Sequence, residues 1–224
     1  MVLNNNFKKM KKRFWFAIGA LVLSSTAATL YLKDPAAVAT SAATGYEIGA
    51  TVADFKLKNV DGNTVALSDY KDKKGAIVVF TCNHCPFAKA YEDRIMELDK
   101  KYAPLGYPVL AVQPNDPVAY EEDSFERMKA RAKEKGYTFP YMIDDNQAVA
   151  KAFGAARTPH VFILKNNSGK FNLEYTGTID DNAQDPAGVT KRYVEDAVSN
   201  LLGGKPVVTT TTKAVGCAIR WKDA

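Results

Sequence analysis

Two cysteines separated by two residues, Cys82 and Cys85, lie where a predicted strand gives way to a predicted helix. Thiols at this spacing can close a small disulfide without backbone movement. The first sulfur then lies over the N-terminus of the helix, where unpaired N–H groups and the helix dipole stabilise a thiolate. The thiolate attacks in disulfide exchange and the second thiol resolves the mixed disulfide, so the pair predicts redox chemistry at this junction.

His84 lies between the two thiols, and we expect its partly protonated ring to favour the thiolate and to make the disulfide more oxidising. The cysteine pair also fits half a zinc site, a structural disulfide or a coincidence. The third and last cysteine, Cys217, lies far along the chain, so no four-cysteine zinc site is available. The strand before the pair and the helix after it favour the redox interpretation. We expect no metal and no cofactor.

A second motif, Thr158-Pro159, precedes a predicted strand that begins at His160. An X-Pro bond ahead of a strand is a place where a cis peptide can expose backbone groups to a partner chain, and the alternative is an ordinary loop proline. The chain has two histidines, His84 and His160, one in each motif. Either both face one site or His160 is a solvated side chain.

Strands and helices alternate along the chain that must position these motifs. The continuous apolar run at residues 75–81 predicts a strand buried on both faces, and residues 86–102 have the apolar spacing of an amphipathic helix that starts with a proline. The remaining pattern predicts a hairpin in 53–67, strands at 107–112, 139–143, 160–164 and 171–176, and helices at 121–135, 148–153 and 189–202. This order predicts an α/β fold with a mixed central sheet flanked by helices and an N-terminal β-hairpin extension.

Composition excludes two broad classes of protein. With 46% apolar and 25% charged residues, the 224-residue chain is neither disordered nor fibrous. The 30 Lys and Arg residues exceed the 25 Asp and Glu residues by five, and five basic residues without an acidic one occur within positions 1–13. The rest of the chain is therefore neutral overall, and we expect no nucleic-acid partner.

The N-terminal 33 residues have the pattern of a targeting segment. The basic cluster is followed by an uncharged, largely apolar stretch at residues 14–32, which includes several small residues. This pattern is typical of a cleaved bacterial export signal or of an uncleaved membrane anchor, and a buried helix is disfavoured by the adjacent cations. We therefore predict a signal or anchor at 1–33, a tether at 34–48, a folded domain at 49–204 and a tail at 205–224, with the domain outside the cytoplasm, in the periplasm or on the outer face of the membrane.

From residue 49 to residue 202 the chain resembles the thioredoxin superfamily, specifically its redoxin or AhpC/TSA (peroxiredoxin-like) branch. The blocks that carry the resemblance are ADFKLKNVDGNTVALSDY, FTCNHCPFAKAYEDR, FPYMIDDNQAVAKAFGA and RTPH, and the tail GCAIRW is also similar to the end of such relatives. The resemblance implies a thioredoxin-like fold and a redox-active Cys82–Cys85 disulfide. It also implies Cys82 as the nucleophile, Cys85 as the resolving thiol and Thr158-Pro159 as the cis-proline loop.

The peroxide-binding pattern of the peroxidatic members is missing. Those members carry Pro-x-x-x-Thr-x-x-Cys, whereas Gly75 and Val79 occupy the corresponding positions before Cys82, and Val78 and Cys82 occupy them before Cys85. This departure argues against efficient peroxidase activity.

The acid that many thioredoxins bury six residues before the first cysteine is replaced by Ala76. Proton transfer is therefore expected from His84, from Lys89 or Glu92 on the following helix, or from water.

We expect an exported or tethered thiol–disulfide oxidoreductase, a monomer that acts on protein disulfides, protein dithiols or small thiols and has a reductant partner. A thiol peroxidase is the first alternative. A copper chaperone similar to the thioredoxin-fold copper-delivery proteins is the second, with Cys82, Cys85 and His160 as Cu(I) ligands, although those proteins separate their cysteines by three residues. A purely structural disulfide is the third.

Cys217 is left unpaired if Cys82 and Cys85 bond to each other. Its alternatives are a small buried apolar residue, a relay to the active-site pair, or an intermolecular bridge. A relay requires the tail after Gly203-Gly204 to fold back onto the pair.

Overall fold

The computed structural model describes residues 45–222, which lie within one of the two units into which the chain divides, residues 40–224. The predicted signal or anchor at 1–33 and most of the predicted tether lie outside the described residues. Within residues 45–222, no helix has the length and apolar character needed to cross a membrane.

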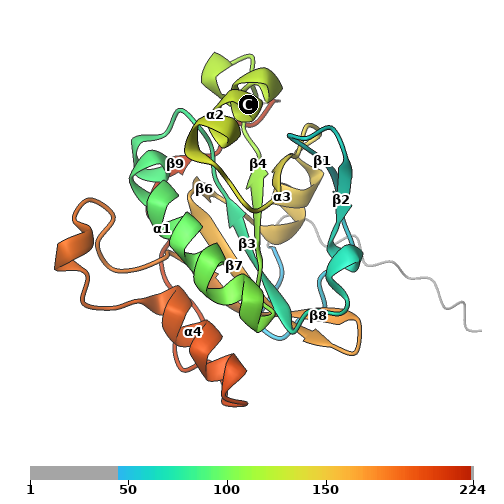
Figure 1. Ribbon diagram of the computed structural model, residues 1–224, viewed down its shortest axis with the longest axis vertical. Coiled ribbons are helices and arrows are strands. Elements are labelled where there is room, and N and C mark those ends of the chain that lie inside the picture. The colour runs from blue at the N-terminus through green and yellow to red at the C-terminus, as the bar shows by residue number, and fades with distance from the viewer. Residues whose placement is uncertain (1–44, 223–224) are drawn as a thin grey trace, which may run out of the picture. The chain divides into compact units, whose positions relative to one another are not determined.

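The domain is built on a seven-stranded mixed sheet with the order β2-β1-β5-β4-β3-β7-β8 (Figure 1). β3 and β4 are parallel, as are β4 and β5, and the other neighbouring pairs are antiparallel. The strands are β1 Lys56–Asn59, β2 Thr64–Ala66, β3 Gly75–Phe80, β4 Val109–Gln113, β5 Tyr141–Ile143, β7 His160–Asn167 and β8 Lys170–Gly177. The predicted mixed sheet and the N-terminal hairpin, β1–β2, are confirmed.

A second, two-stranded sheet joins parts of the chain that are far apart in sequence. It pairs β6, Arg157–Thr158, with β9, Cys217–Ala218, in antiparallel register. In Figure 1 the C-terminal segment that carries β9 lies near the N-terminal end of α1. The tail is therefore part of the fold at the very place where the cysteine pair is expected.

The helices are α1 Pro86–Tyr102, α2 Phe125–Lys135, α3 Ala148–Phe153 and α4 Tyr193–Leu202, with short 3-10 turns η1 Leu67–Tyr70, η2 Ala103–Leu105, η3 Glu121–Asp123 and η4 Pro186–Gly188. Two predicted helices start later than expected. The helix predicted from 121 is interrupted at Ser124, whose backbone is extended, so α2 begins at Phe125. The last helix begins at Tyr193, because Val189 after η4 is also extended.

β3 lies in the middle of two hydrophobic layers, as predicted, and all six of its residues are buried. Ile77 and Val79 pack in the layer that also contains the apolar faces of α1 and α4. Val78 and Phe80 pack in the opposite layer, which includes residues of α3. Because both faces of β3 are fixed, the position of the loop that joins its end to α1 is fixed as well.

The segment between α4 and β9 is mostly exposed but is hydrogen-bonded to the sheet. Its Thr210–Thr212 part lies along β8, where the Thr212 N–H donates to the Thr176 carbonyl and the Thr176 N–H donates to the Thr210 carbonyl. The tail therefore contacts the sheet before it reaches the cysteines.

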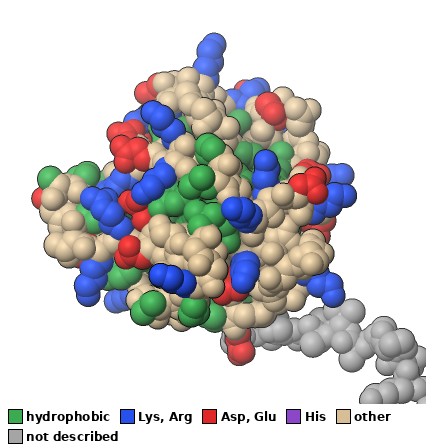
Figure 2. Space-filling view, turned by 60° about the horizontal axis from the view of Figure 1, so that its bottom comes forward, with side chains coloured by type: hydrophobic (Ala, Val, Ile, Leu, Met, Phe, Trp, Pro, Cys, Tyr) green, Lys and Arg blue, Asp and Glu red, His purple; other side chains and the backbone are tan. Residues whose placement is uncertain are grey.

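Lysine and arginine side chains are interspersed with acidic and apolar ones on the face that Figure 2 shows. This face presents no continuous basic surface of the kind that nucleic-acid binding requires.

Candidate active site

Cys82 and Cys85 lie in the loop that joins β3 to α1, as the sequence predicts. Cys85 is the N-cap residue of α1 and Pro86 is the first helical residue, where its fixed φ suits a helix start. Both cysteines are buried, with 2% of Cys82 and none of Cys85 exposed. The site is therefore closed to solvent in this structure.

The disulfide in the structure differs from the predicted one. Cys85 is bonded to Cys217, across 132 residues and with a Cα–Cα distance of 6.0 Å, and Cys82 is a free thiol. The predicted Cys82–Cys85 bond is therefore replaced by a Cys85–Cys217 bond in this form of the protein. Local spacing cannot reveal this pairing, because it depends on where β9 docks.

All three cysteines meet at Thr158, on the cis-proline loop. The Thr158–Pro159 peptide bond is cis, in agreement with the implied loop. The Cys82 thiol donates to the Thr158 hydroxyl at 3.1 Å, and Cys85 Sγ lies 3.2 Å from the Thr158 carbonyl oxygen. Cys217 faces Thr158 in the β6–β9 register. The loop thus brings a free thiol and a disulfide to two sides of one residue.

His84 lies beside Cys82, as predicted, and it also contacts an acid that the sequence analysis did not identify. Its Nδ1 is 3.5 Å from Cys82 Sγ and 2.6 Å from Oδ2 of Asp123. The imidazole stacks on the ring of Tyr120, with ring centres 3.8 Å apart and planes 9° apart. The short contact with the carboxylate indicates that Nδ1 carries a proton, which leaves Nε2 as the basic nitrogen.

Asp123, at the end of η3, is completely buried and holds the loop around the cysteines. Its Oδ1 accepts hydrogen bonds from the backbone N–H of Asn83 at 2.7 Å and of His84 at 3.1 Å, and its Oδ2 accepts one from the Asn115 amide at 2.9 Å. In the sequence Asp123 belongs to a highly charged stretch that indicates a solvated helix, and no spacing distinguishes it from its acidic neighbours.

Burial raises the pKa of the Cys82 thiol from 9.0 to about 12, and the charge of Asp123 acts in the same direction. Hydrogen bonds from Thr158 and from the backbone N–H groups of Cys85 and His84 favour the thiolate but do not offset burial. The expected lowering of this pKa by the helix terminus is therefore wrong for the closed site, where Cys82 is a neutral thiol at pH 7.

His160 makes no hydrogen bond or ring contact with a cysteine. It accepts from the backbone N–H of Ala156, contacts the Thr176 hydroxyl at 3.1 Å and packs against the ring of Phe162. Burial lowers the pKa of His160 to about 4, so the ring is neutral at pH 7. This residue is therefore neither the solvated side chain nor the second active-site histidine that the sequence analysis considered.

The ligand set expected for copper is not assembled. Cys85 is bonded to another sulfur, so it has no thiolate to offer. Within the described part of the chain, the one group of three candidate ligands consists of Cys82, His84 and Asp123, with ligand atoms within 4.8 Å of one another. In this group the Asp123 carboxylate also accepts hydrogen bonds from Asn115 and from the backbone N–H groups of Asn83 and His84.

Of the other proton carriers considered, Lys89 is exposed on α1. Glu92 is buried and accepts hydrogen bonds from Arg131 and from the Tyr137 hydroxyl, at 2.8 Å and 3.1 Å to the same carboxylate oxygen. Glu92 therefore joins α1 to α2, and His84 is the one of these side chains that contacts Cys82.

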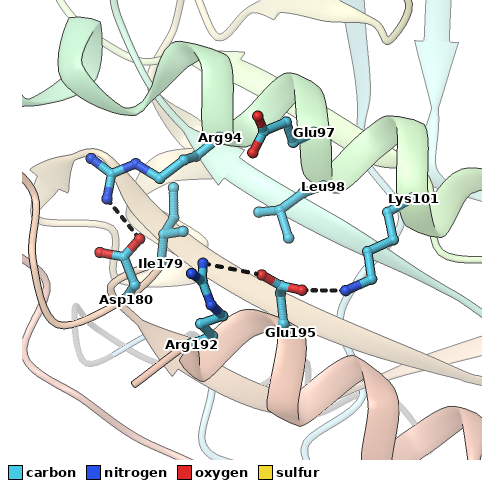
Figure 3. Close-up of a pocket in the computed structure, with 8 residues that line it drawn as sticks. All are labelled: Arg94, Glu97, Leu98, Lys101, Ile179, Asp180, Arg192 and Glu195. Carbon is cyan, nitrogen blue, oxygen red and sulfur yellow. Dashed lines mark hydrogen bonds and ion pairs between the residues drawn. The ribbon is translucent and has the colours of Figure 1, made fainter. Parts of the chain in front are cut away.

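A separate pocket between α1 and α4 contains no cysteine (Figure 3). Five of its six charged side chains pair with one another: Arg94 bonds Asp180 at 2.7 Å, and Glu195 bonds both Lys101 and Arg192. These pairs connect α1 to the chain before and within α4.

Comparisons with known proteins show which family the chain is similar to. A model of the AhpC/TSA family matches residues 48–172, which excludes Cys217. The thiol-disulfide oxidoreductase ResA of Geobacillus thermodenitrificans (strain NG80-2) is 31% identical over 136 residues, which are 61% of this chain and 73% of that protein. The peroxiredoxin Bcp of Bacillus subtilis (strain 168) is 29% identical over 131 residues, 58% of this chain and 73% of that protein.

Among solved structures, an uncharacterized conserved protein of Geobacillus kaustophilus is similar over 81% of this chain and 96% of its own, with 38% identity and a TM-score of 0.74. Together with the sheet order, these similarities confirm the predicted thioredoxin-like fold.

Proposed function

The chain belongs to the AhpC/TSA family and is an oxidoreductase, and we propose that Cys82 is the nucleophile with which it exchanges disulfides of protein or small-thiol substrates. The observation that carries the proposal is the arrangement at Thr158, where the free thiol of Cys82 lies on one side and the disulfide of Cys85 on the other. Thiol–disulfide exchange needs a thiol and a disulfide, and both lie next to each other at this cis-proline loop.

In the reduced protein, the Cys82 thiolate attacks one sulfur of a substrate disulfide. The substrate S–S bond breaks, its second sulfur leaves as a thiolate, and a mixed disulfide forms at Cys82. The Cys85 thiolate then attacks Cys82 Sγ, closes a Cys82–Cys85 disulfide and releases the reduced substrate. Two electrons pass from the cysteine pair to the substrate, and a reductant partner must return them.

His84 supports the thiolate in this scheme. With Nδ1–H donated to Asp123, a proton taken up at Nε2 converts the ring to imidazolium. The positive ring then offsets the Asp123 carboxylate, which otherwise disfavours a negative charge on Cys82.

A thiol peroxidase is the second candidate, and the similarity to the peroxiredoxin Bcp supports it. The structure offers no threonine three residues before Cys82, because that position is Val79, which is buried in the core of β3. We therefore rank disulfide exchange above peroxide reduction.

The experiment that tests the proposal is an insulin-reduction assay with dithiothreitol as the reductant, with hydrogen peroxide replacing insulin in a parallel assay. Wild type is expected to accelerate insulin reduction, Cys82→Ser to abolish the acceleration, and Cys85→Ser to accumulate a mixed disulfide at Cys82. Cys82-dependent peroxide turnover that exceeds insulin turnover would establish the second candidate instead, and a mixed disulfide at another cysteine would contradict the assignment of the nucleophile.

The proposed place of action is outside the cytoplasm, with attachment to the membrane if residues 1–33 are retained, and the proposed state is a monomer. The basic cluster at positions 8–13 and the apolar stretch after it support this location. In cell fractionation, the full chain is expected with the membrane or the periplasm. A version with neutral residues at 8, 9 and 11–13 is expected to lose that location, and a cytosolic wild-type chain would contradict the proposal.

A further inference from the structure

The tail around Cys217 is docked on the cis-proline loop by contacts on both sides of the cysteine. Before it, the Arg157 guanidinium donates to the Gly216 carbonyl at 2.8 Å. After it, the backbone N–H of Ile219 donates to the Ala156 carbonyl at 3.1 Å, and the Ile219 side chain is buried. None of these contacts involves the sulfur of Cys217.

Further along the tail, Arg220 is held at its backbone by two buried side chains. Its N–H donates to the Asn115 side-chain oxygen at 2.9 Å, and its carbonyl accepts from the Gln147 amide at 2.8 Å. Asn115 also donates to Asp123, so the network that holds the tail continues into the network that holds His84. The docking of the tail is thus connected with the active-site loop.

Gly216 makes the close approach of tail and loop feasible. A Cβ at this position would lie 2.2 Å from the Thr158 carbonyl oxygen and 2.6 Å from the Thr158 carbonyl carbon. Both are backbone atoms that cannot move aside alone, so the residue before Cys217 must lack a side chain.

On these grounds we propose that Cys217 is a third catalytic cysteine, which attacks Cys85 in the Cys82–Cys85 disulfide and returns Cys82 to its thiol form. This inference deepens the proposed function and rests on it for the role of Cys82 as the entry nucleophile. A docked thiol reacts at a high effective concentration, because the folding of the tail has already brought the two sulfurs together and the reaction carries no further entropy cost for this.

The step is a balanced disulfide exchange. The Cys217 thiolate attacks Cys85 Sγ, the Cys85–Cys217 bond forms, the Cys82–Cys85 bond breaks, and Cys82 leaves as a thiolate that takes up a proton. The protein gains and loses no electron in this step. The disulfide between Cys82 and Cys85 is replaced by one between Cys85 and Cys217. The structure shows the product of this step, with Cys85 bonded to Cys217 and Cys82 free.

The environment of Cys82 affects the rate of this step. Burial and the Asp123 carboxylate make the neutral thiol the stable form of Cys82, as its raised pKa indicates. Cys82 leaves as a thiolate in the forward step and attacks as a thiolate in the reverse step, so its environment slows both directions. A Cys82 thiolate released beside His84 takes up a proton.

A time course of oxidation of the reduced full chain by oxidised glutathione tests the proposal. Samples are quenched in acid, the remaining thiols are alkylated, and the disulfide-linked peptides are quantified by mass spectrometry. In wild type, the Cys82–Cys85 link is expected first and the Cys85–Cys217 link afterwards, with a rate independent of protein concentration. In Cys217→Ser, the Cys82–Cys85 link is expected to persist.

Two further variants separate a relay from a disulfide that only stabilises the fold. Arg157→Ala, which loses the bond to Gly216 but keeps every thiol, is expected to slow the second step several-fold and to leave the first unchanged. Cys82→Ser is expected to form the Cys85–Cys217 link at least ten-fold more slowly than wild type. Equal rates in Cys82→Ser and wild type, or no conversion of one link into the other, would overturn the relay.

The outcome is independent of the test of the proposed function, because glutathione replaces the protein substrate. Conversion of the Cys82–Cys85 link into the Cys85–Cys217 link, without insulin reduction, would refute the proposed function but support the relay. Insulin reduction without exchange would refute the relay alone.

Discussion

The Asp123 carboxylate lies 2.6 Å from Nδ1 of His84, and it is buried against the loop that carries Cys82. One acid therefore has two effects of opposite sign on Cys82. It disfavours the thiolate by its own charge, and it orients the imidazole that can stabilise the thiolate when protonated.

Asp123→Asn is expected to lower the pKa of Cys82 by about one unit or more, because a neighbouring negative charge is removed. The rate of Cys82 alkylation against pH, in the form with the Cys85–Cys217 bond, measures the shift. Glu121→Gln is the matched control, since this nearby acid is exposed and pairs with Arg127. A pKa that stays the same or rises in Asp123→Asn would contradict the assignment.

His84→Ala is expected to raise the pKa of Cys82, because the ring that offsets Asp123 is lost. Each unit reduces the thiolate fraction about ten-fold at a pH well below the pKa, so alkylation at pH 8 slows in proportion. The measurement uses the Cys217→Ser background, in which the tail is not covalently bonded to Cys85. An unchanged alkylation rate would show that the backbone N–H groups alone stabilise the thiolate.

His160 is expected to make folding pH-dependent between pH 6.5 and about 4. Its pKa is lowered to about 4 by burial, so in this range the unfolded chain takes up a proton that the folded protein does not. The stabilisation by the neutral ring is complete above pH 6.5. It is lost as the pH falls towards 4, by at most about 3.4 kcal/mol.

Urea unfolding of wild type and His160→Gln at pH 8, 6 and 4 measures this contribution. Below pH 6.5 the free energy of unfolding of wild type is expected to decrease relative to that of the variant. A difference that does not vary with pH would show that His160 is accessible to protons in the folded state.

Gly216→Ala is expected to weaken the Cys85–Cys217 disulfide, because the added Cβ collides with the backbone of Thr158. At equilibrium with glutathione buffers, the equilibrium constant for forming this disulfide is expected to be at least about ten-fold lower in the variant than in wild type. This difference corresponds to about 1.4 kcal/mol. Gly203→Ala is the control, since its Cβ would approach nothing closer than 3.4 Å. Equal equilibrium constants for this disulfide in Gly216→Ala and Gly203→Ala would mean that the approach of Gly216 to Thr158 is not needed for Cys217 to reach Cys85.

The local sequence was enough to predict β3, α1 and the loop between them. The apolar run of β3 and the proline at the start of α1 determine these elements through residues that are close in sequence. The cis-proline loop followed from resemblance. Asp123 and Cys217 could not be placed, since the burial of one and the pairing of the other depend on how η3 and β9 dock on distant parts of the chain. His160 was misjudged because its partners, Phe162 and Thr176, come together only when β7 and β8 pair.

The pairing of β9 with β6 has a consequence for recognition. The backbone edge of Arg157 and Thr158 is taken by residues 217–218 of the same chain, so a substrate strand can use this edge only while the tail is away. The apparent affinity for such a strand is its intrinsic affinity multiplied by the fraction of molecules with the edge open. The protein would then select among partners by how well each one competes with its own last strand.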